Sequence, residues 1–185
     1  MLFAMELWKP ILLGGLAVFV MSALVWTLLP HHRTEWAKLM NEDDVGEALR
    51  AASPAPGLYA VPHMGGMSGA GTPEEKAKLI RGPIAYITVL RNGAPAMGPM
   101  MVKSALSSIV IAFFIAYVGW HTLPSGTEYL KVFRVVGTMG FMTYALGSMS
   151  ESIWFGRPWS SFALQALDAL MYGLILGGVF GWLWM

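Results

Sequence analysis

Long apolar runs separated by polar segments dominate the pattern along this chain. The clearest run, residues 10–29, has no charged residue in twenty positions. A bilayer core of about 30 Å needs about twenty helical residues at 1.5 Å each. Three further runs of this kind follow, so the pattern predicts an all-α integral membrane protein with a four-transmembrane-helix bundle. The predicted spans lie in residues 1–29, 100–122, 128–150 and 158–185.

The polar interval between the first two spans, residues 30–99, predicts a small α+β cap. Thr34 favours a short helix that starts at this residue, and Asn41 followed by three acids favours another. The segment at 72–75, Thr-Pro-Glu-Glu, has the capping pattern of a further helix. Two stretches have the composition of β-strands and are expected to pair antiparallel, at 57–61 and 83–90.

Composition strengthens the membrane assignment, because 12% of the residues are charged against about 25% in soluble domains. Such apolar segments need lipid as their solvent, which excludes a soluble globular protein and a disordered chain. The net charge of +1 gives no reason to expect a nucleic-acid partner. We therefore expect membrane lipids as partners of a multi-pass protein whose termini lie on the same side. Lysines and arginines near the span ends number five on the long-loop side and three on the other, which favours a cytoplasmic long loop.

Asp168 is the one acid inside the fourth predicted span, nine residues after Trp159. A charge at such a depth costs roughly 2.5–3.5 kcal/mol on insertion scales, so its side chain should face the bundle interior and be paired or protonated. Tyr144 and Ser148 of the third span lie at comparable depth and are the expected partners. Two interpretations remain open, a proton or cation site and an acid whose bonds to hydroxyl groups fix helix packing.

Two further features favour contacts between helices. Glu151 and Arg157 flank the short loop before the fourth span, and they are expected to form an interfacial ion pair or to contact lipid phosphate. Small residues that repeat every fourth position let helix backbones approach closely in lipid, as at Gly173, Gly177 and Gly181. Packing between the last two spans and packing within a larger assembly explain this repeat equally well.

Metal and cofactor chemistry has little support in the sequence. The chain has no cysteine and none of the spacings of phosphate-binding, hydrolase, zinc-protease or haem-attachment motifs. We therefore expect no cofactor, no metal and no enzymatic activity. Adjacent histidines just after a span are more typical of interfacial anchors than of ligands. The residues that would suit Cu(I), through imidazole and thioether groups, are His31, His32, His63, Met64 and Met67.

Short motifs in the first third of the chain resemble those of a known group of proteins. They are Leu29-Pro-His-His-Arg, the acidic helix start at 41–45 and Pro56-Gly-Leu-Tyr-Ala-Val-Pro. Together they resemble uncharacterised bacterial four-span inner-membrane proteins. The resemblance implies a four-span architecture and a location in the bacterial inner (cytoplasmic) membrane, and it transfers no catalytic or binding residue.

The sequence favours a non-catalytic accessory or structural subunit of a multi-subunit membrane complex. Its partners would be other membrane subunits or a second copy of the chain. The glycine repeat and the lack of a catalytic motif motivate this hypothesis. The alternative is a small transporter or a proton- or ion-coupled membrane protein that uses Asp168. A further alternative is copper handling by the loop that carries His63 and Met64.

Overall fold

The computed structural model describes residues 2–64 and 72–184 of the chain. The chain divides into two compact units. We call Met1–Trp36 together with Ala96–Met185 the helical unit, and Ala37–Pro95 the small unit. The predicted cap, 30–99, is therefore larger than the small unit, because residues 30–36 pack with the helices.

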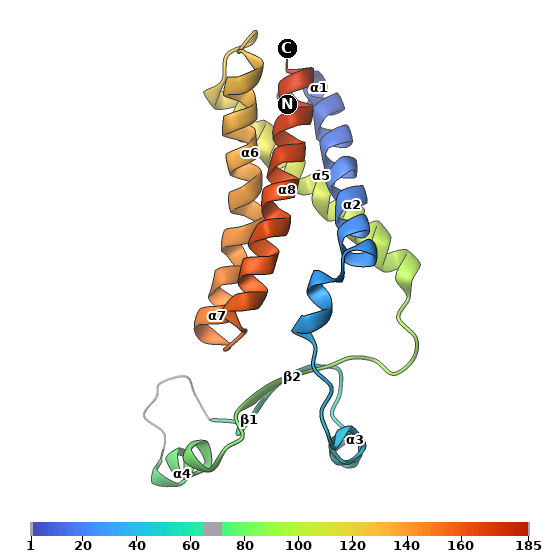
Figure 1. The fold of residues 1–185 in the computed structure, drawn as a ribbon, viewed down its shortest axis with the longest axis vertical. Coiled ribbons are helices and arrows are strands. Elements are labelled where there is room, and N and C mark those ends of the chain that lie inside the picture. Colours follow the sequence, from blue (N-terminus) through green and yellow to red (C-terminus); the bar gives the residue numbers. More distant parts are fainter. Residues whose placement is uncertain (1, 65–71, 185) are drawn as a thin grey trace. The chain divides into compact units, whose positions relative to one another are not determined.

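The helical unit consists of long helices joined by short turns (Figure 1). Helix α1 (Leu2–Glu6) and the end of α8 (Trp159–Leu183) lie at the same end of this unit (Figure 1). There Nε1 of Trp184 donates a hydrogen bond to the carbonyl of Pro124 at 3.1 Å, which ties the end of the chain to the turn between α5 and α6. In chain order its elements are α1 (Leu2–Glu6), α2 (Trp8–Leu28), η1 (Pro30–Glu35), α5 (Met97–Thr122), α6 (Tyr129–Ala145), η2 (Leu146–Ser148), α7 (Met149–Trp154) and α8 (Trp159–Leu183).

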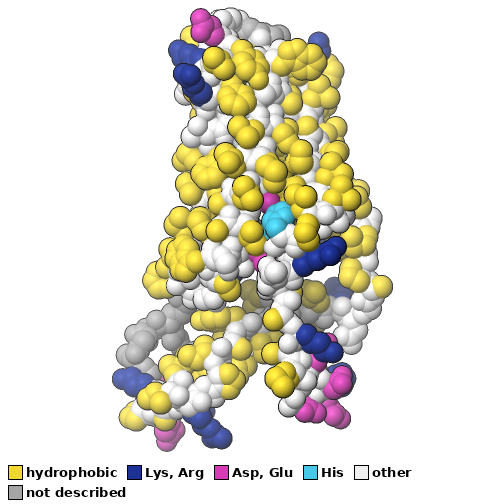
Figure 2. All heavy atoms as spheres, in the orientation of Figure 1, with side chains coloured by type: hydrophobic (Ala, Val, Ile, Leu, Met, Phe, Trp, Pro, Cys, Tyr) yellow, Lys and Arg dark blue, Asp and Glu magenta, His cyan; other side chains and the backbone are white. Residues whose placement is uncertain are grey.

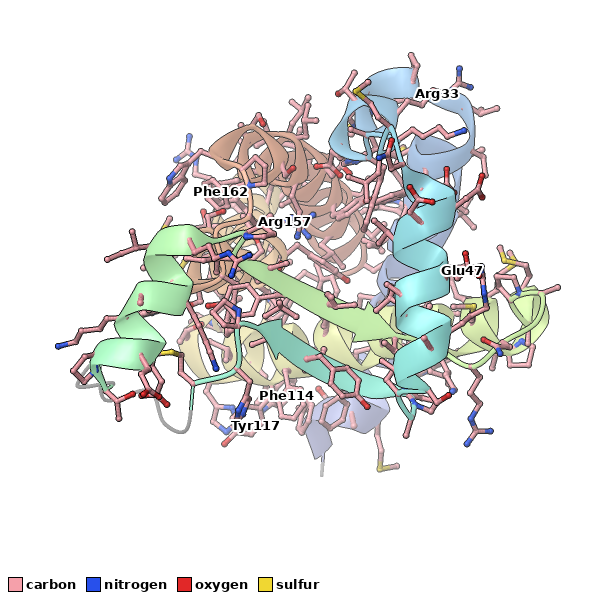
Figure 3. All side chains as sticks on the ribbon, turned by 90° about the horizontal axis from the view of Figure 1, so that it is seen from below. Arg33, Glu47, Phe114, Tyr117, Arg157 and Phe162 are labelled. Atoms are coloured by element: carbon pink, nitrogen blue, oxygen red, sulfur yellow. The ribbon has the colours of Figure 1, made fainter. Side chains whose placement is uncertain are left out.

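Three helices among the described residues are long and apolar enough to cross a membrane: α2 with 21 residues, α5 with 26 and α8 with 25. Twenty helical residues are about 30 Å long, so each of the three matches a bilayer core. Apolar side chains cover the face of these helices shown in Figure 2, and the exposed Phe114 and Tyr117 project from α5 (Figure 3). Because such a surface requires lipid, the chain is an integral membrane protein.

The third predicted span, 128–150, has a different structure from the other three. Helix α6 has 17 residues and carries Lys131 and Arg134 in its first two turns. After Ala145 the chain continues as the 3-10 turn η2 and the short helix α7. A helix of 17 residues extends about 26 Å, which is shorter than a bilayer core of about 30 Å. The four-span bundle therefore stays a prediction.

Helices α6 and α8 lie side by side and pack through glycine residues (Figure 1). A β-carbon placed on Gly173 would lie 2.6 Å from the carbonyl oxygen of Gly137. A β-carbon on Gly177 would lie 2.7 Å from the carbonyl oxygen of Phe133. Because the later residue of one helix meets the earlier residue of the other, the two helices are antiparallel. The glycine repeat is thus used for packing within this chain.

Apolar side chains fill the space between the helices. Gly181, one turn beyond the close contacts of α8, packs against the ring of Tyr129. In lipid, such close packing stabilises a bundle through van der Waals contacts rather than through release of water. Helices α2, α5, α6 and α8 all contribute to the buried core, with Val18, Ile115, Val136, Leu176 and Phe180.

The small unit contains the two strands and the two capped helices that the sequence predicts. Strands β1 (Gly57–Val61) and β2 (Ala85–Val89) pair antiparallel, with Tyr59 opposite Ile87. Helix α3 (Glu42–Ala52) has three acids in its first turn, and α4 (Pro73–Arg81) follows a capping box formed by Thr72 and Glu75. Residue preferences at the helix starts therefore predict both helices, although a side-chain cap is present at Thr72 and absent at Asn41.

The capping box at Thr72 supports a first prediction. The Thr72 side chain accepts a hydrogen bond from the Glu75 backbone N–H at 3.3 Å. Replacing Thr72 by alanine should cost about 0.5–2 kcal/mol and speed amide exchange in residues 73–81 roughly 2- to 30-fold. Hydrogen–deuterium exchange of the full chain measures this change. Thr72→Ser keeps a hydroxyl and should retain most of the protection, whereas equal exchange in both variants would contradict the role of the cap.

Candidate functional site: a buried histidine–carboxylate cluster

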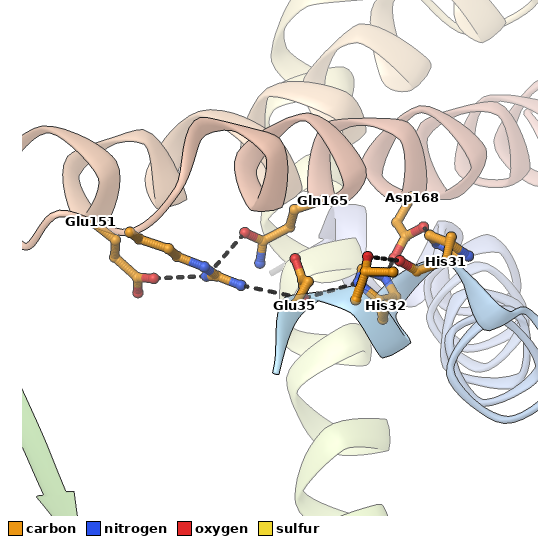
Figure 4. Close-up of polar contacts among 8 residues, drawn as sticks. His31, His32, Glu35, Glu151, Gln165 and Asp168 are labelled. Atoms are coloured by element: carbon orange, nitrogen blue, oxygen red, sulfur yellow. Dashed lines mark hydrogen bonds and ion pairs between the residues drawn. The ribbon is translucent and has the colours of Figure 1, made fainter. Parts of the chain in front are cut away.

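Polar side chains meet inside the helical unit where η1 contacts α8 (Figure 4). Nε2 of His31 lies 3.0 Å from Oδ1 of Asp168, and Nε2 of His32 lies 2.8 Å from Oδ2 of the same carboxylate. The side chains of His32 and Asp168 are 7% and 4% exposed. Each oxygen of the acid therefore faces one imidazole ring. We call His31, His32, Glu35 and Asp168 the histidine–carboxylate cluster.

The local sequence explains why η1 presents these residues together. A residue before proline avoids the helical conformation, and Leu29 is extended, which ends α2. Pro30 then starts a six-residue 3-10 helix. Side chains three residues apart eclipse in such a helix, so His32 and Glu35 share one face. Accordingly, Nδ1 of His32 lies 3.1 Å from Oε2 of Glu35.

The prediction that a short helix starts at Thr34 is wrong. Residues 36–39 have no helical structure, and the helical turn covers Pro30–Glu35 instead. Proline at the first helical position is pre-organised for the turn. The Thr34 hydroxyl donates backwards to the carbonyl of His31 at 3.3 Å rather than capping a later helix. The two histidines thereby lie in a turn packed against α8, whereas the sequence favoured histidines that act as interfacial anchors.

The ring of His32 is also fixed on its flat face. The ring of Trp26 stacks on it with centroids 4.1 Å apart and planes at 4°, and the ring of His31 lies 4.2 Å away at 40°. One face of His32 is therefore covered by an aromatic ring, and both of its nitrogens face carboxylates. This arrangement holds the imidazole in a single orientation.

Arg157 extends the cluster towards the surface. Its Nη2 lies 4.0 Å from Oε2 of Glu35, and its Nη1 lies 2.8 Å from Oε2 of Glu151 and 3.4 Å from Oε1 of Gln165. The Glu35 side chain is 6% exposed, whereas that of Glu151 is 55% exposed. The ion pair expected between Glu151 and Arg157 is therefore present, and its arginine also approaches the buried Glu35. A row of polar side chains therefore connects the buried Asp168 with the exposed Glu151 (Figure 4).

The hydroxyl groups expected beside Asp168 have other neighbours. Oγ of Ser148 donates to the carbonyl of Ala145 at 2.7 Å, which is the usual backbone contact of a serine in a helical turn. The ring of Tyr144 packs edge-on against Tyr172, with centroids 5.2 Å apart. The structure therefore brings Asp168 to the histidines of η1, whereas Tyr144 contacts the next turn of α8.

The remaining residues considered for copper lie in other places. His63 and Met64 belong to the small unit, and Met67 lies outside the described residues. The ligand atoms offered by His31, His32 and Asp168 are nitrogen and oxygen, without the thioether sulfur that favours Cu(I). The site that the structure assembles is thus a different one from the histidine–methionine loop considered in the sequence.

The charges of the cluster favour a positively charged ligand. Asp168 and Glu35 are both buried, and a buried carboxylate is costly unless positive charge compensates for it. Among the described residues, the fixed cation that approaches this pair of acids is Arg157, and it is shared with Glu151. In addition, Oε1 of Glu35 is buried without a hydrogen-bond partner among the described residues. The cluster can therefore accept positive charge as a proton or as a metal cation.

Comparisons with known proteins add one partial similarity. No family model matches the chain, and no solved structure matches it. A stretch of 64 residues is 33% identical to the phospho-N-acetylmuramoyl-pentapeptide-transferase of Enterococcus hirae. The similarity covers 35% of this chain and 17% of that protein. It assigns no family, so the fold and the cluster support a coarser conclusion: the chain is an integral membrane protein with a buried histidine–carboxylate cluster.

Proposed function

We propose that this chain is an ion-coupled membrane protein, a small transporter or a proton- or cation-coupled device, in which Asp168 binds the ion. One observation carries the proposal. A carboxylate buried within the apolar helix α8 has each of its oxygens within 3.0 Å of an imidazole nitrogen. Ionisable groups at such depth are costly in lipid and mark ion or proton pathways. The proposal includes no catalytic step.

The polar groups beyond Asp168 support the same proposal. From the acid, contacts continue through His32 and Glu35 to Arg157, and from there to Glu151. Because Glu151 is exposed, this row of side chains joins the buried acid to the surface of the helical unit. A buried ion needs such a row of polar side chains to enter or leave an apolar bundle.

Replacing Asp168 by asparagine tests this function. Asparagine keeps the size of the side chain and can still pair with both rings, but it removes the negative charge that holds a cation. In liposomes with an imposed pH gradient and membrane potential, the wild-type protein should carry protons or Zn²⁺ faster than empty liposomes. The Asp168→Asn variant should fall to the rate of empty liposomes. Internal pH-sensitive and Zn²⁺-sensitive dyes measure the two fluxes.

Glu128→Gln is the matched control for this experiment. It also removes one carboxylate, yet Glu128 is exposed before α6, makes no side-chain capping bond and lies outside the row. We expect this variant to keep at least half of the wild-type flux. Wild-type flux equal to that of empty liposomes would contradict the proposal, and so would unchanged flux in Asp168→Asn.

The second candidate is a non-catalytic accessory or structural subunit of a larger membrane complex. One observation favours it. The cluster joins η1 to α8 through contacts within the chain, so its charges can hold these two elements together as a structural contact. The glycine repeat no longer supports this candidate, because α6 and α8 use it themselves. If Asp168→Asn abolishes co-purification of partner subunits while the wild type carries no ion, the structural role replaces the ion-coupled one.

A further inference from the structure

We infer that the cation is a divalent transition-metal ion of the zinc class, bound by Nε2 of His31, Nε2 of His32 and an oxygen of Asp168. The inference rests on the cation site proposed above and names its ligand. Neither the sequence motifs nor the comparisons point to this site, because Asp168 is separated from the two histidines by 136 and 137 positions.

The spacing of the three donors fits a small metal ion. Their ligand atoms all lie within 4.8 Å of one another. Bonds of 2.0–2.2 Å to nitrogen and oxygen in a tetrahedral zinc site place neighbouring ligands about 3.3 Å apart. The contacts of 3.0 and 2.8 Å between the rings and Asp168 would therefore open by a few tenths of an ångström. The donors are close to the positions that the ion requires.

Glu35 provides the support that a histidine ligand usually needs. A ligating histidine almost always donates its other ring N–H to a carboxylate, a carbonyl or water, which fixes the tautomer and the ring orientation. Nδ1 of His32 faces Oε2 of Glu35 at 3.1 Å, so Nε2 is the nitrogen left for the metal. Trp26 holds the same ring by stacking. His32 is thus already oriented as a ligand.

The donor set selects the class of ion. Two imidazole nitrogens and one carboxylate oxygen suit zinc and its neighbours in the first transition row, whereas Ca²⁺ and Mg²⁺ prefer oxygen ligands and Cu(I) prefers sulfur. A dication also adds positive charge beside the buried Asp168 and Glu35, whose nearby Arg157 is shared with Glu151. Three protein ligands leave a fourth position, as in zinc sites that exchange a bound molecule.

Equilibrium metal binding tests the inference without measuring transport. The full chain is purified in detergent through a tag that contains no histidine, stripped with a chelator and equilibrated with Zn²⁺. Mass spectrometry of the metal content should then find one zinc per chain. The His31→Ala and Asp168→Asn variants should bind Zn²⁺ more than about 100-fold more weakly, because they remove a ligand rather than its support.

Two further variants separate ligation from other effects. Glu35→Gln should weaken Zn²⁺ binding roughly 10- to 100-fold, the usual loss for a group that orients a ligand, while one zinc still binds at saturation. His121→Ala removes a histidine that is exposed on α5 and should leave binding unchanged. Helical circular dichroism and size-exclusion profiles equal to those of the wild type establish that each variant is folded.

The absorption of Co²⁺ provides a readout that a merely structural cluster would not give. Cobalt in a tetrahedral site with nitrogen and oxygen ligands absorbs visible light strongly, and six-coordinate cobalt does so weakly. We expect the strong bands in the wild type and their loss in His31→Ala. No stoichiometric Zn²⁺ binding by the wild type, or unchanged binding in both ligand variants, would overturn the inference. Proton flux that depends on Asp168, without metal binding, would overturn the metal assignment but leave the proposed function standing. Metal binding without any flux would overturn the proposed function but leave the metal assignment standing.

Discussion

Replacing His32 by alanine is expected to destabilise the helical unit by about 1–3 kcal/mol, the usual cost of leaving a buried polar group without one of its hydrogen-bond partners. The change leaves Asp168 with His31 as its remaining ring partner and takes from Glu35 its contact at 3.1 Å. Both acids stay buried. The variant also removes the ring that stacks on Trp26, so packing is lost together with the charge contact.

The effect of His32→Ala can be measured as the loss of helical circular dichroism with heat or with added denaturing detergent. His121→Ala is the matched control, because His121 is exposed and contacts the backbone of its own helix. That variant should change stability by less than about 0.5 kcal/mol. Equal stability of the two variants would show that the buried cluster contributes nothing to the fold.

A double variant identifies the cause of the loss. When both partners of a buried polar pair are replaced by apolar groups, the cost is often small or reversed. Adding Asp168→Leu to His32→Ala should therefore recover part of the stability that His32→Ala loses, because the buried acid that has lost one of its two ring partners disappears. Additive losses in the double variant would instead indicate that packing, rather than charge, explains the effect of His32.

Hydrophobic pattern and capping signals were sufficient to predict most of the secondary structure. The apolar runs that contain α2, α5 and α8 are long and hold few charged residues, and a bilayer imposes a strict length on such runs. The strands of the small unit and the start of α4 at Thr72 follow from local residue preferences. Each of these features depends on neighbours in the sequence, which is why the sequence alone contains the information.

The site could be predicted in part. Asp168 stands out in the sequence because an acid within an apolar helix needs a partner. Its partners could not be inferred from how deep each residue lies along its predicted span. Such a comparison assumes that every span is a straight helix, and it leaves out the turn that follows α2. Pro30 ends α2 by keeping Leu29 extended, and it also starts η1 and directs His31 and His32 towards α8. The adjacent pair of histidines after a proline was the signal available.

The third predicted span shows a second limit of the sequence. Residues 128–150 are apolar enough on average to predict a span, but the chain leaves the α-helix at Ala145 and forms η2 and α7. The loop after α7 then places Arg157 next to both Glu151 and Glu35. If 128–150 were one continuous helix, η2 and α7 would not form. The position of Arg157 therefore depends on the interruption of the helix at Ala145.

Replacing Gly177 by alanine is expected to cost about 1–3 kcal/mol, as overpacking of a tight interface usually does. The added methyl group would lie 2.7 Å from the carbonyl oxygen of Phe133 and 3.3 Å from the α-carbon of Gly137. Both atoms belong to the backbone of α6, which cannot rotate away as a side chain can. The two helices must therefore separate, and the van der Waals contacts that hold helices together in lipid are weakened.

Gly178→Ala is the matched control for this prediction, because it makes the same chemical change one position further along α8. A β-carbon there would meet the Tyr129 hydroxyl at 3.8 Å, an ordinary contact, and alanine is favoured over glycine inside a helix by roughly 0.5–1 kcal/mol. Unfolding measured by circular dichroism should therefore move in opposite directions in the two variants. A loss of stability in Gly178→Ala as large as that in Gly177→Ala would contradict the close contact of α6 and α8. The opposite signs would show that the glycine repeat stabilises this chain by itself, without a second subunit.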